Sequence, residues 1–210
     1  MTIIRAPQPD AIARAGDLIR QGEIVVYPTE TLYGLAADAF NEDAVRRVFE
    51  MKGRRADVPM PIIVADKEML REVVKRVNTM AKRLMEAFWP GPLTMVFDAA
   101  PGLSEMLTGG TGSIGIRIPS SEIALDLVYA AGGPISATSA NISGAEPPLD
   151  PIEAVSQLAH KPAMVIDAGK IEYAEPSTVV DIRGETVRVL RHGAIPRESI
   201  IRALEGTRRF

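Results

Sequence analysis

The sequence predicts a mixed α/β fold. Amphipathic helical patterns alternate with short, β-branched apolar runs along the whole chain. These runs outnumber the strands that a simple βαβ repeat would supply. The last two runs, near 178–182 and 187–190, are joined by residues 183–186, a hairpin-like connection that pairs strands antiparallel. We therefore expect a mixed sheet with flanking helices rather than a purely parallel sheet.

The N-terminal part of the chain predicts a helix, a strand and a loop. Apolar residues recur at helical spacing over 10–21, and Gly22 stops that helix. The apolar run 24–27 predicts a strand, which Pro28 ends. We expect the following segment, up to Asp38, to be a loop at the end of this strand.

A second helix begins after Asn41, whose side chain can cap it. The apolar face of this helix comprises Ala44, Val45, Val48 and Phe49. Lys52 lies on the continuation of the same face. A lysine thus occupies a position where an apolar residue would normally stand.

The remaining elements are predicted by the same patterns. We expect strands near 61–65, 93–98, 114–118, 135–138, 163–167, 178–182 and 187–190. We expect helices near 67–75, 78–88, 121–131, 151–159 and 196–204. The proline-rich stretch 147–151 resembles a linker, but nothing demands a second domain, so we expect one domain over 1–210.

Composition excludes several classes of protein and site. The chain has no cysteine, and His160 and His192 are its only imidazoles, so we expect neither a thiol nucleophile nor a structural zinc site. The net charge of −3 argues against broad electrostatic capture of nucleic acid but allows a local basic groove. The N-terminus lacks a signal-peptide pattern, and no apolar stretch approaches the roughly 20 residues of a membrane span. We expect a cytoplasmic protein with no membrane partner.

A glycine-rich segment precedes one of the predicted strands. Residues 110–115 spell GxGxxG, but a strand rather than a helix follows them, so a dinucleotide-binding loop is not supported. Arg117 lies within that strand and alternates to the opposite face from Ile116 and Ile118. Its guanidinium can bind a carboxylate or phosphate in a cleft. On the residues alone, a solvated arginine accounts for this position at least as well.

Other segments carry groups that suit phosphate. Residues 136–144 gather hydroxyl and amide groups after an apolar strand, a pattern typical of a phosphate or ribose site and equally of a cap or turn. Four cations each end or border an apolar element and together could neutralise a triphosphate: Lys52, Arg54, Arg117 and Arg191. A cation at a helix C-terminus also favours the helix dipole without any further role. Neither a Walker sequence nor a GxSxG turn occurs, so a P-loop and a serine hydrolase are not supported.

Seven blocks occur in order along the chain: YPTETLYGL (27–35), KGR (52–54), WPGPLT (89–94), GIRIP (115–119), SANISG (139–144), STVVD (177–181) and LRHG (190–193). In this combination and order the chain resembles the YrdC family, over about residues 10–195. The resemblance covers nearly the whole chain.

The resemblance implies a fold and a reaction. The fold would be a twisted mixed α/β sheet with flanking helices and a concave, basic cavity, in a short form without an additional C-terminal domain. The enzyme would be a nucleotidyltransferase that converts L-threonine, bicarbonate and ATP into threonylcarbamoyl-AMP and pyrophosphate, with Mg²⁺ accompanying the nucleotide. Partner proteins would then use the adenylate to modify position 37 of tRNA, and direct contact with RNA is a further expectation.

The resemblance also implies site residues, position by position. The L-threonine-binding positions are matched by Thr31, Arg117 and Ser177. The ATP-binding positions are matched by Arg54, Val58, Ser113, Ser139 and Arg191. The family's KxR and SxN signature, and with it the expected catalytic set, is completed by Lys52, Arg54, Ser139 and Asn141. No protein ligand to a metal is expected.

Two departures from the family pattern stand out. Many relatives carry a histidine after the KxR block, whereas residues 59–63 of this chain contain none, and Pro147 stands near the position of a late loop serine. One threonine contact and one ATP contact are therefore unassigned. Two other functions remain open at this stage: a carbamoyl-adenylate-forming enzyme and a non-catalytic RNA-binding module.

Overall fold

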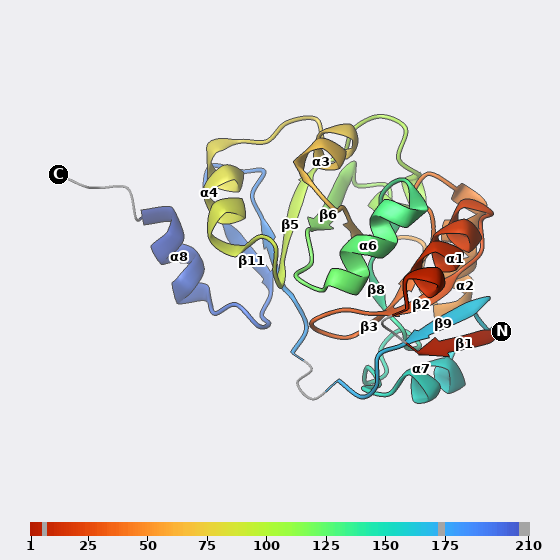
Figure 1. Cartoon of the computed structure of the whole chain (residues 1–210). Coiled ribbons are helices and arrows are strands. Elements are labelled where there is room, and N and C mark those ends of the chain that lie inside the picture. Colours follow the sequence, from red (N-terminus) through yellow and green to blue (C-terminus); the bar gives the residue numbers. More distant parts are fainter. Residues whose placement is uncertain (6–7, 172–174, 206–210) are drawn as a thin grey trace.

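A computed structural model describes residues 1–5, 8–171 and 175–205 of the protein (Figure 1). Its helices are α1 (Pro9–Arg20), α2 (Glu42–Lys52), α3 (Lys67–Val73), α4 (Thr79–Phe88), α5 (Glu105–Thr108), α6 (Glu122–Ala131), α7 (Pro151–Gln157) and α8 (Arg197–Glu205). Its strands are β1 (Thr2–Arg5), β2 (Val25–Pro28), β3 (Tyr33–Ala36), β4 (Ile62–Ile63), β5 (Leu93–Asp98), β6 (Ser113–Arg117), β7 (Ile135–Ser136), β8 (Thr138–Ser139), β9 (Met164–Asp167), β10 (Thr178–Asp181) and β11 (Arg188–Arg191). None of the described helices is long and apolar enough to cross a membrane.

The strands form two sheets, and each mixes parallel with antiparallel pairs. The 5-stranded sheet has the order β1-β9-β2-β3-β8, and the 6-stranded sheet has the order β11-β10-β5-β6-β4-β7. In the first sheet β1 and β2 run parallel to β9, while β2 and β3 are antiparallel. In the second, β10 runs parallel to β5 and antiparallel to β11. The predicted mixed α/β fold and the late hairpin are confirmed, with the strands divided between two sheets.

The two sheets meet at Ala137. The strand expected over 135–138 is two short strands, because β7 pairs with β4 in one sheet and β8 pairs with β3 in the other. The buried Ser136 hydroxyl secures this crossing: it donates to the Leu35 carbonyl at 2.8 Å and accepts from the Ala37 amide at 3.0 Å. The chain thus passes from one sheet to the other within the segment that leads into residues 139–144.

The segment after β2 differs from the prediction. Residues 28–38 were expected to be a loop, but Tyr33–Ala36 form β3, which pairs antiparallel with β2. All four residues of β3 are buried, so the strand lacks the apolar–polar alternation that marks a half-buried strand. Strand β1 and the short helix α5 were also not predicted, while the other expected helices and strands occur within a few residues of their predicted bounds.

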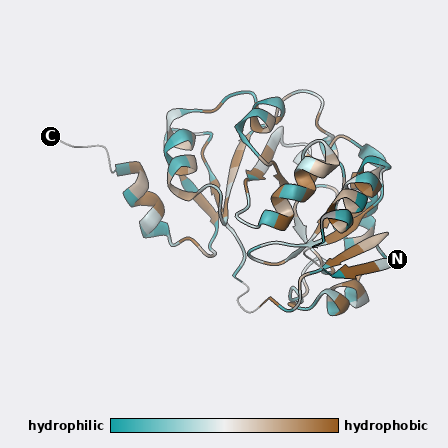
Figure 2. Cartoon of the chain, viewed as in Figure 1, coloured by the Kyte–Doolittle hydropathy of each residue, from teal (hydrophilic) through white to brown (hydrophobic). Residues whose placement is uncertain are grey.

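The helices cover the sheets with their apolar faces. Helices α1 and α6 lie side by side against the first sheet, where a Cβ on Gly16 would lie 2.5 Å from the Ala130 carbonyl carbon (Figure 1). Figure 2 shows apolar residues on the strands and a mixture of hydrophilic and apolar residues along the helices. Glycine at position 16 is therefore needed for the close approach of the two helices.

Helix α2 positions one residue of the candidate site. The Asn41 side chain accepts a hydrogen bond from the Ala44 amide at 3.0 Å and so caps the N-terminus, as predicted. Gly53, with φ of 56°, ends the helix in the left-handed conformation. Lys52 is thereby the last helical residue, and its side chain is buried.

Candidate active site

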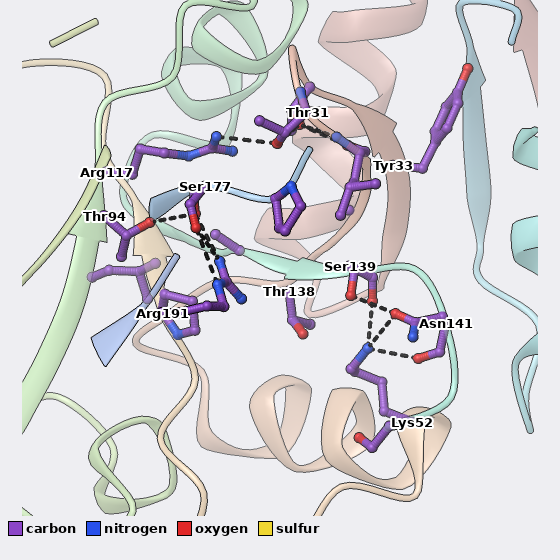
Figure 3. Close-up of a pocket in the computed structure, with 18 of the residues that line it drawn as sticks. Thr31, Tyr33, Lys52, Thr94, Arg117, Thr138, Ser139, Asn141, Ser177 and Arg191 are labelled. Carbon is purple, nitrogen blue, oxygen red and sulfur yellow. Dashed lines mark hydrogen bonds between the residues drawn. The ribbon is translucent and has the colours of Figure 1, made fainter. Parts of the chain in front are cut away.

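A cavity of about 210 Å³ lies where the two sheets meet. Its wall is built by strand ends and connecting loops from both sheets, and Figure 3 shows its principal side chains. Eight predicted site residues line it: Thr31, Lys52, Arg54, Arg117, Ser139, Asn141, Ser177 and Arg191. These eight residues come from six of the seven sequence blocks, and Thr94 of the remaining block also lines the cavity.

The Lys52 ammonium holds the loop that follows β8. Its Nζ donates to the carbonyl oxygens of Ser139 and Asn141, the latter at 2.7 Å, and to the Asn141 side-chain oxygen at 3.4 Å (Figure 3). The Lys52 carbonyl in turn accepts from the Ser143 amide at 2.8 Å. Both ends of this residue thus tie the end of α2 to the loop.

The Asn141 side chain makes hydrogen bonds within the same loop. Its Nδ2 donates to the carbonyls of Ile142 and Ala145, at 2.9 and 2.7 Å, and its Oδ1 accepts from the Ser139 hydroxyl. All the side-chain polar atoms of Asn141 are therefore engaged in shaping the loop. Lys52 and Asn141 together set the path of its backbone.

Burial depresses the pKa of Lys52. Desolvation is the main cause and the nearby Arg54 guanidinium adds to it, lowering the pKa from 10.5 to about 7. No carboxylate of the described chain forms an ion pair with Lys52, Arg54 or Arg191. The cavity wall thus carries positive charge that a bound anion would compensate.

Arg54 lines the cavity from the loop after α2. Its guanidinium stacks over the Phe49 ring at 5.9 Å and donates to the carbonyls of Val58, at 3.3 Å, and Pro59, at 2.5 Å. Desolvation and the charge of Arg191 lower the pKa of Arg54. The fold positions this cation on the loop after α2 without using a carboxylate.

Arg117, at the end of β6, is buried on the opposite wall. One of its terminal nitrogens donates to the Glu30 carboxylate at 3.1 Å and to the Thr31 hydroxyl at 3.3 Å. Thr31 also shares a 3.0 Å hydrogen bond with the Thr29 hydroxyl. The alternation seen in the sequence therefore does direct Arg117 into the cavity rather than to solvent.

Ser177 and Arg191 are hydrogen-bonded to each other, and both line the cavity. Arg191, at the end of β11, donates to the Ser177 carbonyl at 2.8 and 3.1 Å and to its hydroxyl at 2.9 Å. The Ser177 hydroxyl also bonds to the Thr94 hydroxyl at 2.9 Å. Desolvation, followed by the charge of Arg117, lowers the pKa of Arg191. The late hairpin thus supplies both a hydroxyl and a cation to the site.

Two predicted ATP-binding residues lie elsewhere in the structure. Val58 and Ser113 are not among the described residues that line the cavity. Val58 is exposed and contributes its carbonyl to Arg54. Ser113 begins β6, where it is buried and its hydroxyl bonds to Thr111 at 2.7 Å. Arg117 reaches the cavity from the other end of the same strand, so Ser113 lies away from it.

Several cavity residues were given no site role from the sequence, although Thr29 and Tyr33 were left open as possible substrate contacts. Those with polar side chains are Tyr27, Thr29, Tyr33, Thr94, Thr138 and Ser143. Thr29 and Tyr33 belong to the first sequence block, so their position in the loop next to Thr31 was the available signal. Burial raises the pKa of both tyrosines, which keeps their phenols neutral hydrogen-bonding groups.

Metal-binding side chains were searched for among the described residues of the cavity and its surroundings. The described residues contain no group of three or more histidine, aspartate or glutamate side chains that could hold a metal ion. The described lining of the cavity contains no acidic residue.

The sequence of the chain matches a known protein family. The Sua5/YciO/YrdC family model, described as "Telomere recombination", matches residues 17–193. The chain belongs to the Sua5/YciO/YrdC family. The resemblance seen in the sequence blocks is thereby confirmed.

Members of the Sua5/YciO/YrdC family with assigned names are similar over most of the chain. A Pyrococcus abyssi protein named threonylcarbamoyl-AMP synthase is 40% identical over 186 residues, which are 89% of this chain and 55% of that protein. A Mycobacterium tuberculosis protein named putative threonylcarbamoyl-AMP synthase is 39% identical over 193 residues, which are 92% of this chain and 88% of that protein.

Solved structures of the Sua5/YciO/YrdC family share the fold. Sua5 of P. abyssi, solved in complex with L-threonine, has a TM-score of 0.92 and 38% identity, and the match covers 97% of this chain and 60% of that one. Escherichia coli YciO has a TM-score of 0.85 and 27% identity, with 95% and 98% covered. The chain thus spans somewhat more than half of the P. abyssi protein and nearly all of YciO.

One wall of the cavity carries the family departure noted in the sequence. Pro61 and Ile62 line the cavity in the segment 59–63, where the resemblance led us to expect a histidine that this chain lacks. Ile62 belongs to β4 and is fully buried. This part of the wall is apolar, so it can contact a methyl group but cannot donate a side-chain hydrogen bond.

Proposed function

We propose that the protein is an L-threonylcarbamoyladenylate synthase. One observation carries the proposal: Lys52, Arg54 and Arg191 line a single cavity without carboxylate partners in the described chain, opposite the buried Arg117. Such a cavity suits a polyphosphate and an amino-acid carboxylate together. The similarity to P. abyssi Sua5, solved with L-threonine, supports the identity of the amino acid.

The reaction would proceed in two steps within this cavity. The threonine amine would form a nitrogen–carbon bond to carbon dioxide derived from bicarbonate, lose a proton to solvent and become an N-carboxylate. An oxygen of that carboxylate would then attack the α-phosphorus of ATP, and the bond to the β-phosphate would break to release pyrophosphate. The protein need supply no covalent group, because alignment and charge compensation lower the barrier.

Each group of residues would have its own task. Arg117, with Thr31 and Ser177, would hold the threonine. Arg54 and Arg191 would receive the phosphates, and the loop after β8 would present Ser139 to the α-phosphate and ribose. Lys52 would contribute charge while it holds that loop, since its three ammonium protons already have acceptors in the structure.

The expected partners follow from this reaction. Besides L-threonine, bicarbonate and ATP, Mg²⁺ would accompany the nucleotide as its counter-ion. Proteins that modify tRNA would consume the adenylate. Val58 and Ser113 keep their proposed roles near ATP only if nucleotide binding extends beyond the cavity toward them.

The decisive experiment is formation of the adenylate. Purified protein is supplied with ATP, Mg²⁺ and labelled bicarbonate, with and without L-threonine, and the products are separated by chromatography with mass detection. Labelled threonylcarbamoyl-AMP and pyrophosphate that appear only with threonine are the expected result. If folded protein yields no such product, the same assay is repeated with carbamoyl phosphate in place of threonine and bicarbonate, which tests for a carbamoyl-adenylate-forming enzyme. Salt-dependent RNA binding is then measured to test for an RNA-binding module.

A further inference from the structure

Glu30 is an acidic group beside an otherwise basic cavity. It lies between the cavity residues Thr29 and Thr31, in the loop that joins β2 to β3. Its Oε1 accepts from Arg117 at 3.1 Å, and the two side chains are only 19% and 7% exposed. This is a largely buried ion pair, in contrast to the pairs on the protein surface.

The Glu30–Arg117 pair leaves hydrogen-bonding groups unused on both partners. Glu30 Oε2 is buried and has no hydrogen-bond partner among the described residues. Arg117 has five N–H donors, yet its hydrogen bonds to described residues all involve one terminal nitrogen. A buried polar atom without a partner is costly, so an unused acceptor beside unused donors favours a ligand that completes the pair once the Glu30 side chain, which does not line the cavity, turns toward it.

The chemistry of an amino acid matches the two unused sets of groups. In a free amino acid at neutral pH, the ammonium nitrogen and the carboxylate carbon are attached to the same carbon atom. A site that binds the carboxylate through an arginine therefore needs an acceptor for the ammonium immediately beside that arginine. Glu30 is the carboxylate in contact with Arg117; it is not itself among the described residues that line the cavity, and none of those residues is acidic.

We propose that Glu30 accepts the α-ammonium group of the amino-acid substrate, so that the Glu30–Arg117 pair recognises a zwitterion. The inference rests on the proposed function, in which Arg117 holds the substrate carboxylate. It adds a residue that determines specificity: the site should reject carboxylates that lack an amine. Glu30 would also orient the nitrogen that later reacts.

The alternative is that Glu30 only neutralises and orients Arg117. The two roles predict different effects of Glu30→Gln on the affinity for a deaminated analogue of L-threonine. If Glu30 binds the ammonium, removing its charge weakens L-threonine binding but leaves a deaminated analogue unaffected or more tightly bound, because Arg117 is then less neutralised. If Glu30 only positions Arg117, both ligands lose affinity together.

The test is calorimetric titration of the full chain with L-threonine and with (R)-3-hydroxybutyrate, which keeps the carboxylate and hydroxyl but lacks the amine. For Glu30→Gln we expect at least a tenfold loss of affinity for L-threonine and no loss for the hydroxy acid. The exposed Glu50→Gln serves as the matched control and should leave both affinities unchanged. Equal losses for both ligands, or unchanged threonine affinity, would overturn the inference.

The unmodified protein provides a second measurement that does not depend on the variant folding. It should bind L-threonine at least tenfold more tightly than (R)-3-hydroxybutyrate. Comparable affinities for the two ligands would refute the role of Glu30. Absence of L-threonine binding in folded, unmodified protein would instead contradict the proposed function itself, so the two failures are distinguishable.

Discussion

At the scale of single residues, the function of Lys52 depends on its burial. The residue is 2% exposed, and its ammonium bridges Ser139 and Asn141. Lys52→Met would remove the charge and leave buried oxygens without a donor. We expect turnover, measured as pyrophosphate release, to fall by about two orders of magnitude, or roughly 3 kcal/mol. The exposed Lys161→Met is the control; normal turnover in Lys52→Met would show that the bridge is not needed.

The same residue predicts how stability depends on pH. The pKa of Lys52 is about 7 in the folded protein, below its ordinary value of 10.5, so the unfolded chain binds more protons between these two values. The contribution of Lys52 to the free energy of unfolding therefore increases as the pH rises from about 7 towards 10.5. The same contribution is lost as the pH is lowered to about 7. Denaturant titrations of the wild type and Lys52→Met at a series of pH values should show the difference shifting in favour of the wild type as pH rises. A difference that is constant with pH would contradict the lowered pKa.

At the scale of secondary-structure elements, Gly193 allows the segment after β11 to pack closely against the residues that precede β10. A Cβ at Gly193 would lie 2.1 Å from the Pro176 carbonyl oxygen and 2.7 Å from the Ser177 carbonyl carbon. Gly193→Ala should destabilise the protein by about 1–3 kcal/mol because the backbone must shift. It should also raise the threonine requirement, since Ser177 moves with it.

Gly184 in the same hairpin is the matched control for Gly193. A Cβ added at Gly184 would have the Thr186 carbonyl oxygen, 3.8 Å away, as its nearest neighbour. Denaturant unfolding and threonine-dependent turnover of Gly184→Ala should stay close to the wild type. If Gly193→Ala behaved like Gly184→Ala in both assays, the close approach at Gly193 would matter neither for stability nor for the use of threonine.

At the scale of the whole molecule, the cavity joins two sheets, so a ligand in it should stabilise the entire chain. A ligand at 100 times its Kd adds about 2.7 kcal/mol, which corresponds to a rise in Tm of about 5–10 °C for a protein of this size. Arg54→Ala should reduce the Tm shift caused by ATP and retain the shift caused by L-threonine. Thermal unfolding of Arg14→Ala, on the exposed face of α1, controls for loss of charge. Equal loss of both shifts in Arg54→Ala would contradict the assignment of Arg54 to the phosphates.

Local patterns in the sequence determined the elements and several of the groups that the cavity uses. Asn41 caps α2, and helical periodicity placed Lys52 on the buried face of that helix. Strand alternation turned Arg117 away from Ile116 and Ile118, toward the side that became the cavity. The face on which each side chain lies depends on neighbours within a few residues, so it was predictable without the fold. That the Arg117 side would be a cavity was not, because a solvated arginine suited the sequence at least as well.

Only the tertiary structure decided which strands pair and which side chains meet. β3 was missed because it is buried on both faces, and the strand expected at 135–138 divides because its halves pair with different sheets. The contact between Glu30 and Arg117 joins residues 87 positions apart. Ser113 shares a strand with Arg117, and Val58 follows closely after Arg54, yet neither lines the cavity. Contacts between distant segments depend on sheet order and packing, which short-range residue patterns do not encode.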